Sequence, residues 1–378
     1  MWSVKALTRL DHRVIIVLVC LMSISLVVIS SYSVPDSLNP GEEPFFTPMV
    51  RVQLQWFLMG WVVFILSACF DYNRLREWTW LLYLLVLGSL VGLFFTDAIQ
   101  RVNRWYRIPL IHISFQPSEY AKIGVVWTLS WFLERRRNIA SSWSTCFFSV
   151  LIVGIPFFLI LKQPDLGTAL VLLPMSFVML YFGGVRPSIV KGMAFFGGML
   201  LILVASLFSG LLPYETLRPY ATHILKEYQF ERLNPATPHQ KAAATAIGLG
   251  GWSGVGWRQS SYSGRGWLPY PYTDSVFPAF GEEFGLMGLF FLMGLYYCLI
   301  HFGFQVTAVA KDSFGQLLSA GVTVYLAMHI LVNIGMMSGL LPITGVPLLL
   351  ISYGGSSILS TMLALGILQN IYSQRFMF

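Results

Sequence analysis

Charged residues are scarce in this sequence. They make up 11% of its 378 residues, and hydrophobic residues make up 56%, whereas roughly a quarter of the residues in a soluble domain are charged. So few charges cannot cover a packed surface in water, which excludes a water-soluble globular protein. Cysteines are also few, and their spacing fits neither a CxxC redox site nor a metal site. We therefore predict small buried side chains at Cys20, Cys69, Cys146 and Cys298.

Linkers, low-complexity tracts and convincing internal repeats are absent as well. Since nothing divides the chain, we expect residues 1–378 to form a single membrane domain. The formal net charge is +7, but the basic residues form no lysine-rich domain or tail. A nucleic-acid partner is therefore not expected.

Apolar runs of about 20 residues, the length that crosses a ~30 Å hydrocarbon core, recur along most of the chain. In hydrocarbon every backbone amide needs a partner within its segment, so these runs predict helices. The short alternating segments of a β-barrel are not present. The fold class that we expect is an all-α integral membrane protein with about ten transmembrane helices. The predicted spans lie near residues 14–32, 51–70, 75–95, 117–133, 143–161, 166–184, 188–212, 284–306, 314–339 and 343–369.

The basic residues sort by membrane side. With the N-terminus in the cytoplasm, one face receives most of them, as the positive-inside rule requires, and an even number of spans places both termini there. These residues are Lys5, Arg9, Arg13, Arg74, Arg76, Arg135, Arg136, Arg137, Arg186, Lys191, Lys311 and Arg375. Arg101, Arg104 and Arg107 are exceptions, because they fall on the opposite, extracytoplasmic face.

One large extracytoplasmic loop, about residues 213–275, interrupts the series of spans. Loops of this length are usually functional or disordered, and its many aromatic side chains argue against disorder. We expect these rings to reach the membrane interface or to line a cleft. They are Trp252, Trp257, Tyr262, Trp267, Tyr270 and Tyr272. Because the loop shares its face with the three exceptional arginines, chemistry is predicted outside the cytoplasm.

Ionisable groups at membrane depth cost about 2.5–3.5 kcal/mol each at a helix centre, so they are candidates for function. The first cluster follows Arg104 and lies in residues 115–122. Pro117 can begin a helix, Glu119 then lies in the first turn, where the dipole favours an anion, and Lys122 shares its face. An ion pair at the helix start would explain both charges. A cationic cradle for a phosphate-bearing ligand would also explain the nearby arginines.

Two further clusters contain carboxylates. Asp165 is predicted to cap the helix that follows it, and its place on the outer face also lets it point into an outward cavity. Asp274, Glu282 and Glu283 lie within ten residues where the large loop re-enters the membrane. Like charges held close raise a carboxyl pKa, which suits a general base near neutral pH. A helix cap at Asp274 with acidic residues at the interface is the alternative.

Glycines and hydroxyls gather in the last cluster, in residues 333–337, 341–347 and 352–357. Two adjacent glycines flanked by hydroxyls could break a helix and expose backbone polar groups beside a water-filled cavity. Small residues could equally serve close helix packing. Ser356 is the hydroxyl that we include among the candidate substrate-binding residues.

Taken in this order, segments 115–122, 163–168, 273–285 and 352–357 resemble the SEDS family (shape, elongation, division and sporulation proteins), and the resemblance covers nearly the whole chain. Segment 339–347 is more similar to RodA, the elongation member, than to the division paralogue FtsW. The sequence departs from the family before Asp274, since Tyr270 and Tyr272 stand where the family has a glutamate and a histidine. Glu282 and Glu283 are expected to share the work of those two residues.

The resemblance implies a peptidoglycan glycosyltransferase at the outer face of the bacterial cytoplasmic membrane. Its substrate would be lipid II, a disaccharide-pentapeptide on undecaprenyl pyrophosphate, with the prenyl tail among membrane lipid. The implied partner is a class B penicillin-binding protein, a transpeptidase of the wall-elongation complex. A divalent cation, Mg²⁺ or Mn²⁺, is the one cofactor considered, and the need for it stays open.

Asp274 matches the family's essential acidic residue, and we expect it to act as the general base. Positive charge would then neutralise the departing pyrophosphate; the candidates for this are Arg104, Lys122, Arg51 and Arg107. Glu119 would hold Lys122, and Asp165 would orient sugar or base. Three alternatives stay open: a lipid II flippase or transporter, a non-catalytic scaffold of a wall-synthesis complex, and an FtsW-like division paralogue.

Overall fold

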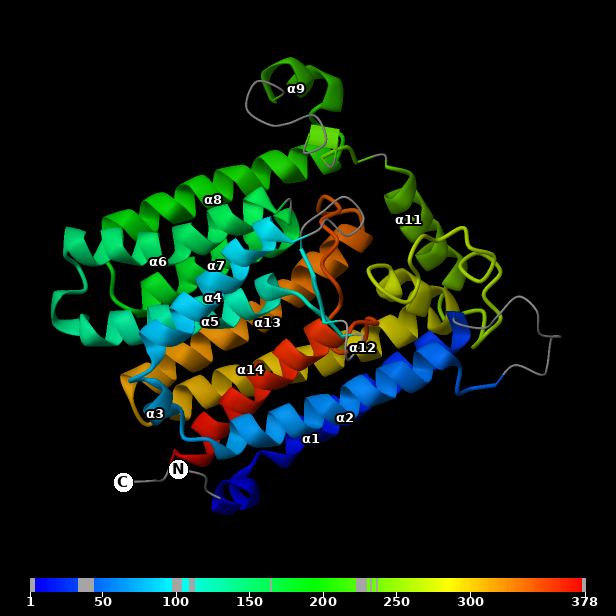
Figure 1. Ribbon diagram of the computed structural model, residues 1–378. Coiled ribbons are helices and arrows are strands. Elements are labelled where there is room, and N and C mark those ends of the chain that lie inside the picture. Colours follow the sequence, from blue (N-terminus) through cyan, green and yellow to red (C-terminus); the bar gives the residue numbers. More distant parts are fainter. Residues whose placement is uncertain are drawn as a thin grey trace.

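Long helices that run side by side account for most of the computed structural model (Figure 1). It describes residues 4–32, 44–96, 104–108, 113–163, 165–221, 230–231, 233–235 and 237–375. The α-helices are α1 His12–Tyr32, α2 Pro48–Cys69, α3 Tyr72–Leu75, α4 Thr79–Gly92, α5 Pro117–Arg135, α6 Trp143–Lys162, α7 Leu166–Phe182, α8 Pro187–Phe208, α9 Tyr214–Ala221, α11 Pro238–Gly250, α12 Val276–Val309, α13 Ser313–Met337 and α14 Gly355–Ser373. The 3-10 helices and strands are η1 Val4–Arg9, η2 Leu93–Phe95, η3 Arg137–Ile139, β1 Tyr106–Ile108 and β2 Ile113–Phe115.

Each of the ten predicted spans contains one of these helices. Among the described residues, six helices are long and apolar enough to cross a membrane. They are α1, α2, α6, α8, α12 and α13. The apolar stretches Thr79–Phe95 and Gly167–Phe182 are shorter. The chain is therefore a multi-pass helical membrane protein, as the composition predicts.

Helices α5 and α14 carry more polar residues because they lie inside the bundle. Nearly all of α5 from Pro117 to Leu133 is buried, including two charged side chains, and α14 buries serines, one threonine and two amides. At the other extreme, α8 buries only Val190 and Leu207 and presents an apolar surface suited to lipid. The buried polar residues of α5 and α14 thus face protein, as the cost of polar groups in hydrocarbon requires.

The start of the last predicted span is wrong. Residues 343–354 are apolar enough to suggest membrane helix, but α14 begins only at Gly355. Pro342, Gly345 and Pro347 lie in the preceding segment, which has no helix, and Gly345 has a φ of 73°. Proline removes a backbone donor, and a positive φ ends a right-handed helix, so this segment forms a buried loop between α13 and α14.

Helix α12 starts earlier than predicted and is interrupted near the predicted start, at Gly285, which has φ 64° and ψ −167°. The interruption frees backbone groups that pair with the large loop. The N–H groups of Leu286 and Met287 donate to the carbonyls of Gly251 and Trp252 at 2.9 and 3.1 Å. A Cβ at residue 285 would lie 2.3 Å from a loop nitrogen, so only glycine permits this contact.

The basic loops lie together at one end of the bundle. Arg76 pairs with Glu134, and Arg137 donates to the hydroxyl of Ser313 at 2.9 Å. These contacts join the loops before α4, after α5 and before α13. In Figure 1 α3 lies at that end and α11 at the other, so the large loop and the basic loops are at opposite ends.

One feature differs from the all-α prediction: strands β1 and β2 form a small antiparallel hairpin, with Tyr106 opposite Phe115. The predicted loop 213–275 is also not entirely irregular, since it contains α9 and α11. The four cysteines are free; Cys69 and Cys146 are buried as predicted, whereas Cys20 and Cys298 are partly exposed.

The close packing of α2 on α14 provides a test of the bundle. A Cβ at Gly366 would lie 1.8 Å from Ser67 Oγ and 2.7 Å from the carbonyl oxygen of Phe64. We expect Gly366→Ala to lower the free energy of unfolding in detergent by about 1–3 kcal/mol, because the helices must separate. Gly294→Ala is the matched control, since a Cβ there meets nothing within 4 Å. Equal stability of the two variants would contradict this packing.

Candidate active site

Asp274 lies at the end of a tight turn and is separated from the start of α12 by Ser275. The carbonyl of Tyr270 accepts the N–H groups of Thr273 and Ser275 at 3.1 and 3.2 Å, and the hydroxyl of Ser275 bonds to His239 Nε2 at 2.7 Å. The Asp274 side chain is half-buried. Its carboxylate makes no hydrogen bond to the part of the chain that the structure describes, so it is available to a ligand.

Two charged neighbours affect this carboxyl group. Burial raises the pKa of Asp274 above its ordinary value, the positive charge of Arg104 lowers it, and the negative charge of Asp165 raises it. Burial prevails, and the pKa is raised. The structure therefore brings Asp274, Arg104 and Asp165 together, three residues that are far apart in the sequence.

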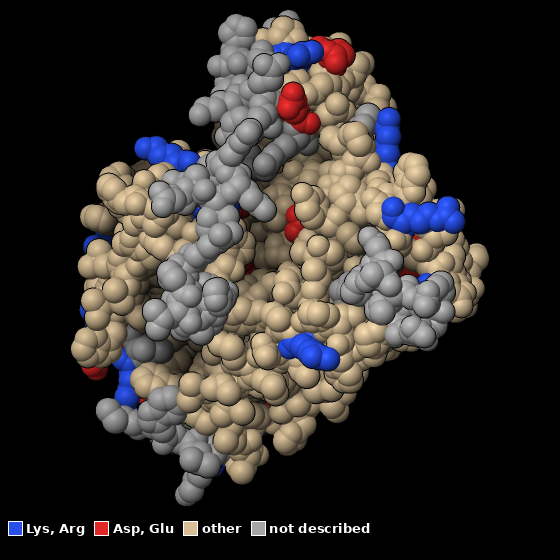
Figure 2. Space-filling model, turned by 45° about the vertical axis from the view of Figure 1, so that its right-hand side comes forward, with Lys and Arg blue, Asp and Glu red and all other residues tan. Residues whose placement is uncertain are grey.

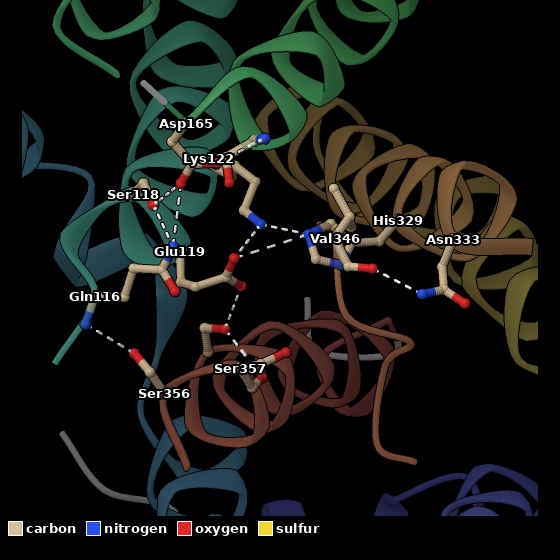
Figure 3. Close-up of polar contacts among 12 residues, drawn as sticks. Gln116, Ser118, Glu119, Lys122, Asp165, His329, Asn333, Val346, Ser356 and Ser357 are labelled. Carbon is tan, nitrogen blue, oxygen red and sulfur yellow. Dashed lines mark hydrogen bonds and ion pairs between the residues drawn. The ribbon is translucent and has the colours of Figure 1, made fainter. Parts of the chain in front are cut away.

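Asp165 caps α7, as predicted. Its Oδ1 accepts the N–H of Thr168 at 3.4 Å, and its Oδ2 accepts hydrogen bonds from Gln116 Nε2 and Ser118 Oγ, each at 3.1 Å (Figure 3). Both carboxylate oxygens are thus engaged with protein. Asp165 ties the start of α5 to the start of α7 and supplies negative charge near Asp274.

Arg104 precedes β1 and is fixed to the end of α6. Its Nε donates to the carbonyl of Gln163 at 3.0 Å, and Gln163 Nε2 donates to the carbonyl of Leu90 at 2.8 Å. Of the other exceptional arginines, Arg101 lies outside the described residues, and the side chain of Arg107 is not described. Arg104 is thus the arginine of this group that the structure places beside Asp274.

Glu119 and Lys122 form an ion pair inside the bundle, as predicted, with Nζ and Oε1 2.8 Å apart (Figure 3). Lys122 is 0% exposed and Glu119 is 2% exposed. Lys122 Nζ also contacts His329 Nε2 and lies 5.1 Å from the centre of the Tyr325 ring. Ser360 donates to Glu119 Oε2 at 3.3 Å. A charged ammonium group is therefore enclosed by a carboxylate, an imidazole and an aromatic face.

This burial changes the role expected for Lys122. An ammonium group that is 0% exposed cannot touch a phosphate in this conformation, so its contacts here are structural. His329 was missed by the sequence reasoning, although one signal was present: it is an ionisable residue inside an apolar run.

Glu282 and Glu283 fold the large loop and are not directed at Asp274. Glu282 accepts the N–H groups of Tyr262 and Ser263, each at 2.9 Å. Glu283 accepts the N–H of Arg258 at 3.0 Å and the hydroxyl of Ser31. These two carboxylates therefore hold segment 258–263 against α12.

The two remaining candidates lie at helix starts. Ser356, in the first turn of α14, accepts the N–H of Gln116 at 3.0 Å and so joins α14 to the start of α5 (Figure 3). Arg51 is in the first turn of α2, and its side chain is exposed. Ser356 thus belongs to the polar region that includes Asp165, whereas no contact between described residues places Arg51 in it.

The face around the large loop is hollowed. Figure 2 shows acidic atoms inside a hollow whose surroundings are mostly uncharged. Within the described ranges no three His, Cys, Asp or Glu side chains gather into a metal site. The described side chains alone therefore form no preassembled cation site.

Comparison with known proteins identifies the family. The sequence pattern of the FtsW/RodA/SpoVE family, described as cell cycle protein, matches residues 11–376. The chain belongs to this family. Peptidoglycan glycosyltransferase MrdB of Escherichia coli K12 is 31% identical to this FtsW/RodA/SpoVE protein over 97% of the chain and 94% of the relative. A probable peptidoglycan glycosyltransferase FtsW of Trichlorobacter lovleyi is 28% identical over 97% of the chain and 93% of its own length.

Solved structures of similar proteins share the fold of this FtsW/RodA/SpoVE protein. One, from work described as "Structural coordination of polymerization and crosslinking by a peptidoglycan synthase complex", has a TM-score of 0.76 at 25% identity and covers 98% of this chain and 99% of its own. Rod shape determining protein RodA of Thermus thermophilus has a TM-score of 0.68 at 24% identity, with 98% of both chains covered. The second likeness supports the fold alone.

Proposed function

We propose that this chain, a peptidoglycan glycosyltransferase, polymerises lipid II with Asp274 as the general base. The observation that carries the proposal is the placement of Asp274. Its carboxylate has no hydrogen bond within the described chain, lies in the electrostatic reach of Arg104 and has a pKa raised by burial. A base with a raised pKa accepts a proton more readily near neutral pH.

The reaction is a single displacement. Lipid II carries its sugar α-linked to pyrophosphate, and peptidoglycan is β-1,4-linked, so one inversion is the simplest route. The 4-hydroxyl of the acceptor sugar attacks the anomeric carbon of the donor and loses its proton to Asp274. The bond from that carbon to the pyrophosphate oxygen breaks, and undecaprenyl pyrophosphate leaves. Arg104 would stabilise the negative charge that develops on this leaving group.

The proposed topology has ten membrane crossings with both termini in the cytoplasm. The basic loops near Arg76 and Arg137 would face the cytoplasm, and the large loop with Asp274 would face outward. In this proposal residues 1–378 form a single membrane domain. The prenyl tail of the substrate would lie against lipid-facing helices such as α8, whose surface is largely apolar.

The proposed partner is a class B penicillin-binding protein of the wall-elongation complex. The likeness to a chain from a peptidoglycan synthase complex supports this partner. The chain is also 31% identical to MrdB, which is a RodA protein, against 28% to the FtsW relative from Trichlorobacter lovleyi. Elongation is therefore favoured over division.

Purified protein in lipid vesicles with its transpeptidase partner tests the function. We expect lipid II to be converted into long glycan strands that lysozyme cleaves. A flippase would move fluorescent lipid II across the vesicle membrane without forming strands, and a scaffold would do neither. Absence of strands under conditions in which the partner is bound and folded would refute the polymerase assignment.

The pH dependence of this activity tests the pairing of Arg104 with Asp274. Asp274 must be ionised to accept a proton, so activity falls as the pH drops through its pKa. Arg104→Ala removes the charge that lowers this pKa, and we expect the acidic limb of kcat/KM to move to higher pH. Activity at neutral pH should also fall about 10- to 100-fold because a charge-assisted contact to the leaving group is lost.

Arg104→Lys is the matched control, because it keeps the positive charge. Its acidic limb should stay close to that of the wild-type protein. If the pH profile of Arg104→Ala overlays the wild-type profile, Arg104 does not influence the pKa of the catalytic carboxyl group.

A further inference from the structure

The turn that ends in Asp274 is held through its backbone carbonyls. Beyond the two bonds that close the turn, three successive carbonyls each accept a hydrogen bond from the segment that runs from α13 to α14. The carbonyl of Tyr272 accepts Tyr353 N–H at 2.8 Å, that of Thr273 accepts Ser352 Oγ–H at 2.6 Å, and that of Asp274 accepts Asn333 Nδ2–H at 3.1 Å.

The side chain of Asn333 is held in place by burial and by a second hydrogen bond. It is 0% exposed, and its Nδ2 also donates to the carbonyl of Val346 at 2.7 Å (Figure 3). Both neighbours are carbonyl oxygens, which settles which end of the amide faces them. Asn333 therefore links the Asp274 turn to the loop before α14.

Ser352 is fixed in the same way. It is 4% exposed, and its hydroxyl accepts the N–H of Leu348 at 2.8 Å while it donates to Thr273. The same loop also passes close to the carboxylate, since a Cβ at Gly345 would lie 3.5 Å from Asp274 Oδ2. Asp274 thus rests against a buried loop on one side and is open to a ligand on the other.

We propose that Asn333 and Ser352 are positioning residues that hold the Asp274 carboxylate at the reacting sugar, an inference that rests on the proposed polymerase function. The hydrogen bonds go to main-chain carbonyls, so they are independent of the side chains in the turn. This independence explains how Tyr270 and Tyr272 can occupy positions where the family has a glutamate and a histidine. Tyr270 is in fact 64% exposed.

A loosened turn would affect chemistry more than binding. A misplacement of about 1 Å can cost on the order of 10²-fold in rate, whereas lipid II is bound over a much larger surface than one carboxylate. We therefore expect Asn333→Leu and Ser352→Ala each to lower kcat by about 10- to 100-fold, with KM nearly unchanged. Ser352→Thr keeps the hydroxyl and should retain most of the activity.

The control for a purely structural loss is Asn370→Leu. Asn370 is a buried asparagine on α14, 1% exposed, whose Nδ2 donates to the carbonyl of Ala68 at 2.6 Å, and it takes no part in the Asp274 turn. Steady-state kinetics of lipid II polymerisation and melting temperatures would be measured for all variants in the complex with the partner. Asn370→Leu should lower the melting temperature without lowering kcat of the folded protein.

The outcomes separate the two proposals. If the wild-type protein polymerises lipid II and Asn333→Leu and Ser352→Ala keep kcat within twofold, the positioning role is wrong while the polymerase function stands. A kcat loss that Asn370→Leu shares at equal melting temperature would also overturn it. If Asn333→Leu does not fold, the contrast between Ser352→Ala and Ser352→Thr decides. A wild-type protein that makes no glycan would instead refute the proposed function.

Discussion

Asp274→Asn is expected to lower kcat of lipid II polymerisation by about 10²–10⁴-fold, the usual contribution of a general base. The amide has nearly the shape of the carboxylate but cannot take the proton of the attacking hydroxyl. The main-chain bond from Asn333 to residue 274 is untouched by the change, so the turn should keep its conformation. Initial rates of glycan formation at saturating lipid II measure the effect.

Asp312→Asn is the matched control. Asp312 caps the N-terminus of α13, whereas Asn333 lies near the C-terminal end of that helix. Asp312 accepts the N–H of Gly315 at 2.7 Å and the hydroxyl of Tyr72 at 3.0 Å. Its replacement should cost stability and leave the rate per folded molecule close to that of the wild-type protein. Full activity of Asp274→Asn would remove Asp274 from the chemistry.

The sequence correctly predicted a multi-pass helical membrane protein, because hydropathy depends on composition over about twenty residues. The prediction of helix boundaries failed where single prolines and glycines determine the backbone conformation. The apolar segment 343–354 was assigned to a span, yet Pro347 and the positive φ of Gly345 keep it out of helix. That loop supplies Ser352 and Tyr353 to the Asp274 turn. The last cluster included both residues, but the predicted helix did not place them at that turn.

The candidate site was predicted only where local sequence rules apply. The Glu119–Lys122 pair and the cap at Asp165 follow from local helix rules, and both are confirmed. His329 was not assigned to the site, and Asn333 was named only within the last cluster. Their contacts with Lys122 and the Asp274 turn join residues more than fifty positions apart in the sequence. The burial of Lys122 also could not be predicted from the sequence. A lysine can be assigned to a helix face from spacing, but spacing does not show whether protein or solvent covers that face.

Lys122→Met is expected to lower the free energy of unfolding by about 3–5 kcal/mol, the usual cost of removing one partner of a buried ion pair. The change leaves the carboxylate of Glu119, which is 2% exposed, without its counter-charge. Glu119→Gln should cost less, because Lys122 keeps its contacts with His329 and the Tyr325 ring. Denaturant titration in mild detergent measures both losses.

The double variant Lys122→Met with Glu119→Gln separates a structural from a substrate-binding role. Since it removes both charges, it should recover most of the stability lost in Lys122→Met. If the Glu119–Lys122 pair only stabilises the fold, the double variant should also recover the polymerisation rate per folded molecule. If Lys122 instead leaves its buried site to meet the pyrophosphate, the double variant will be stable and still inactive, because a neutral side chain cannot replace that charge.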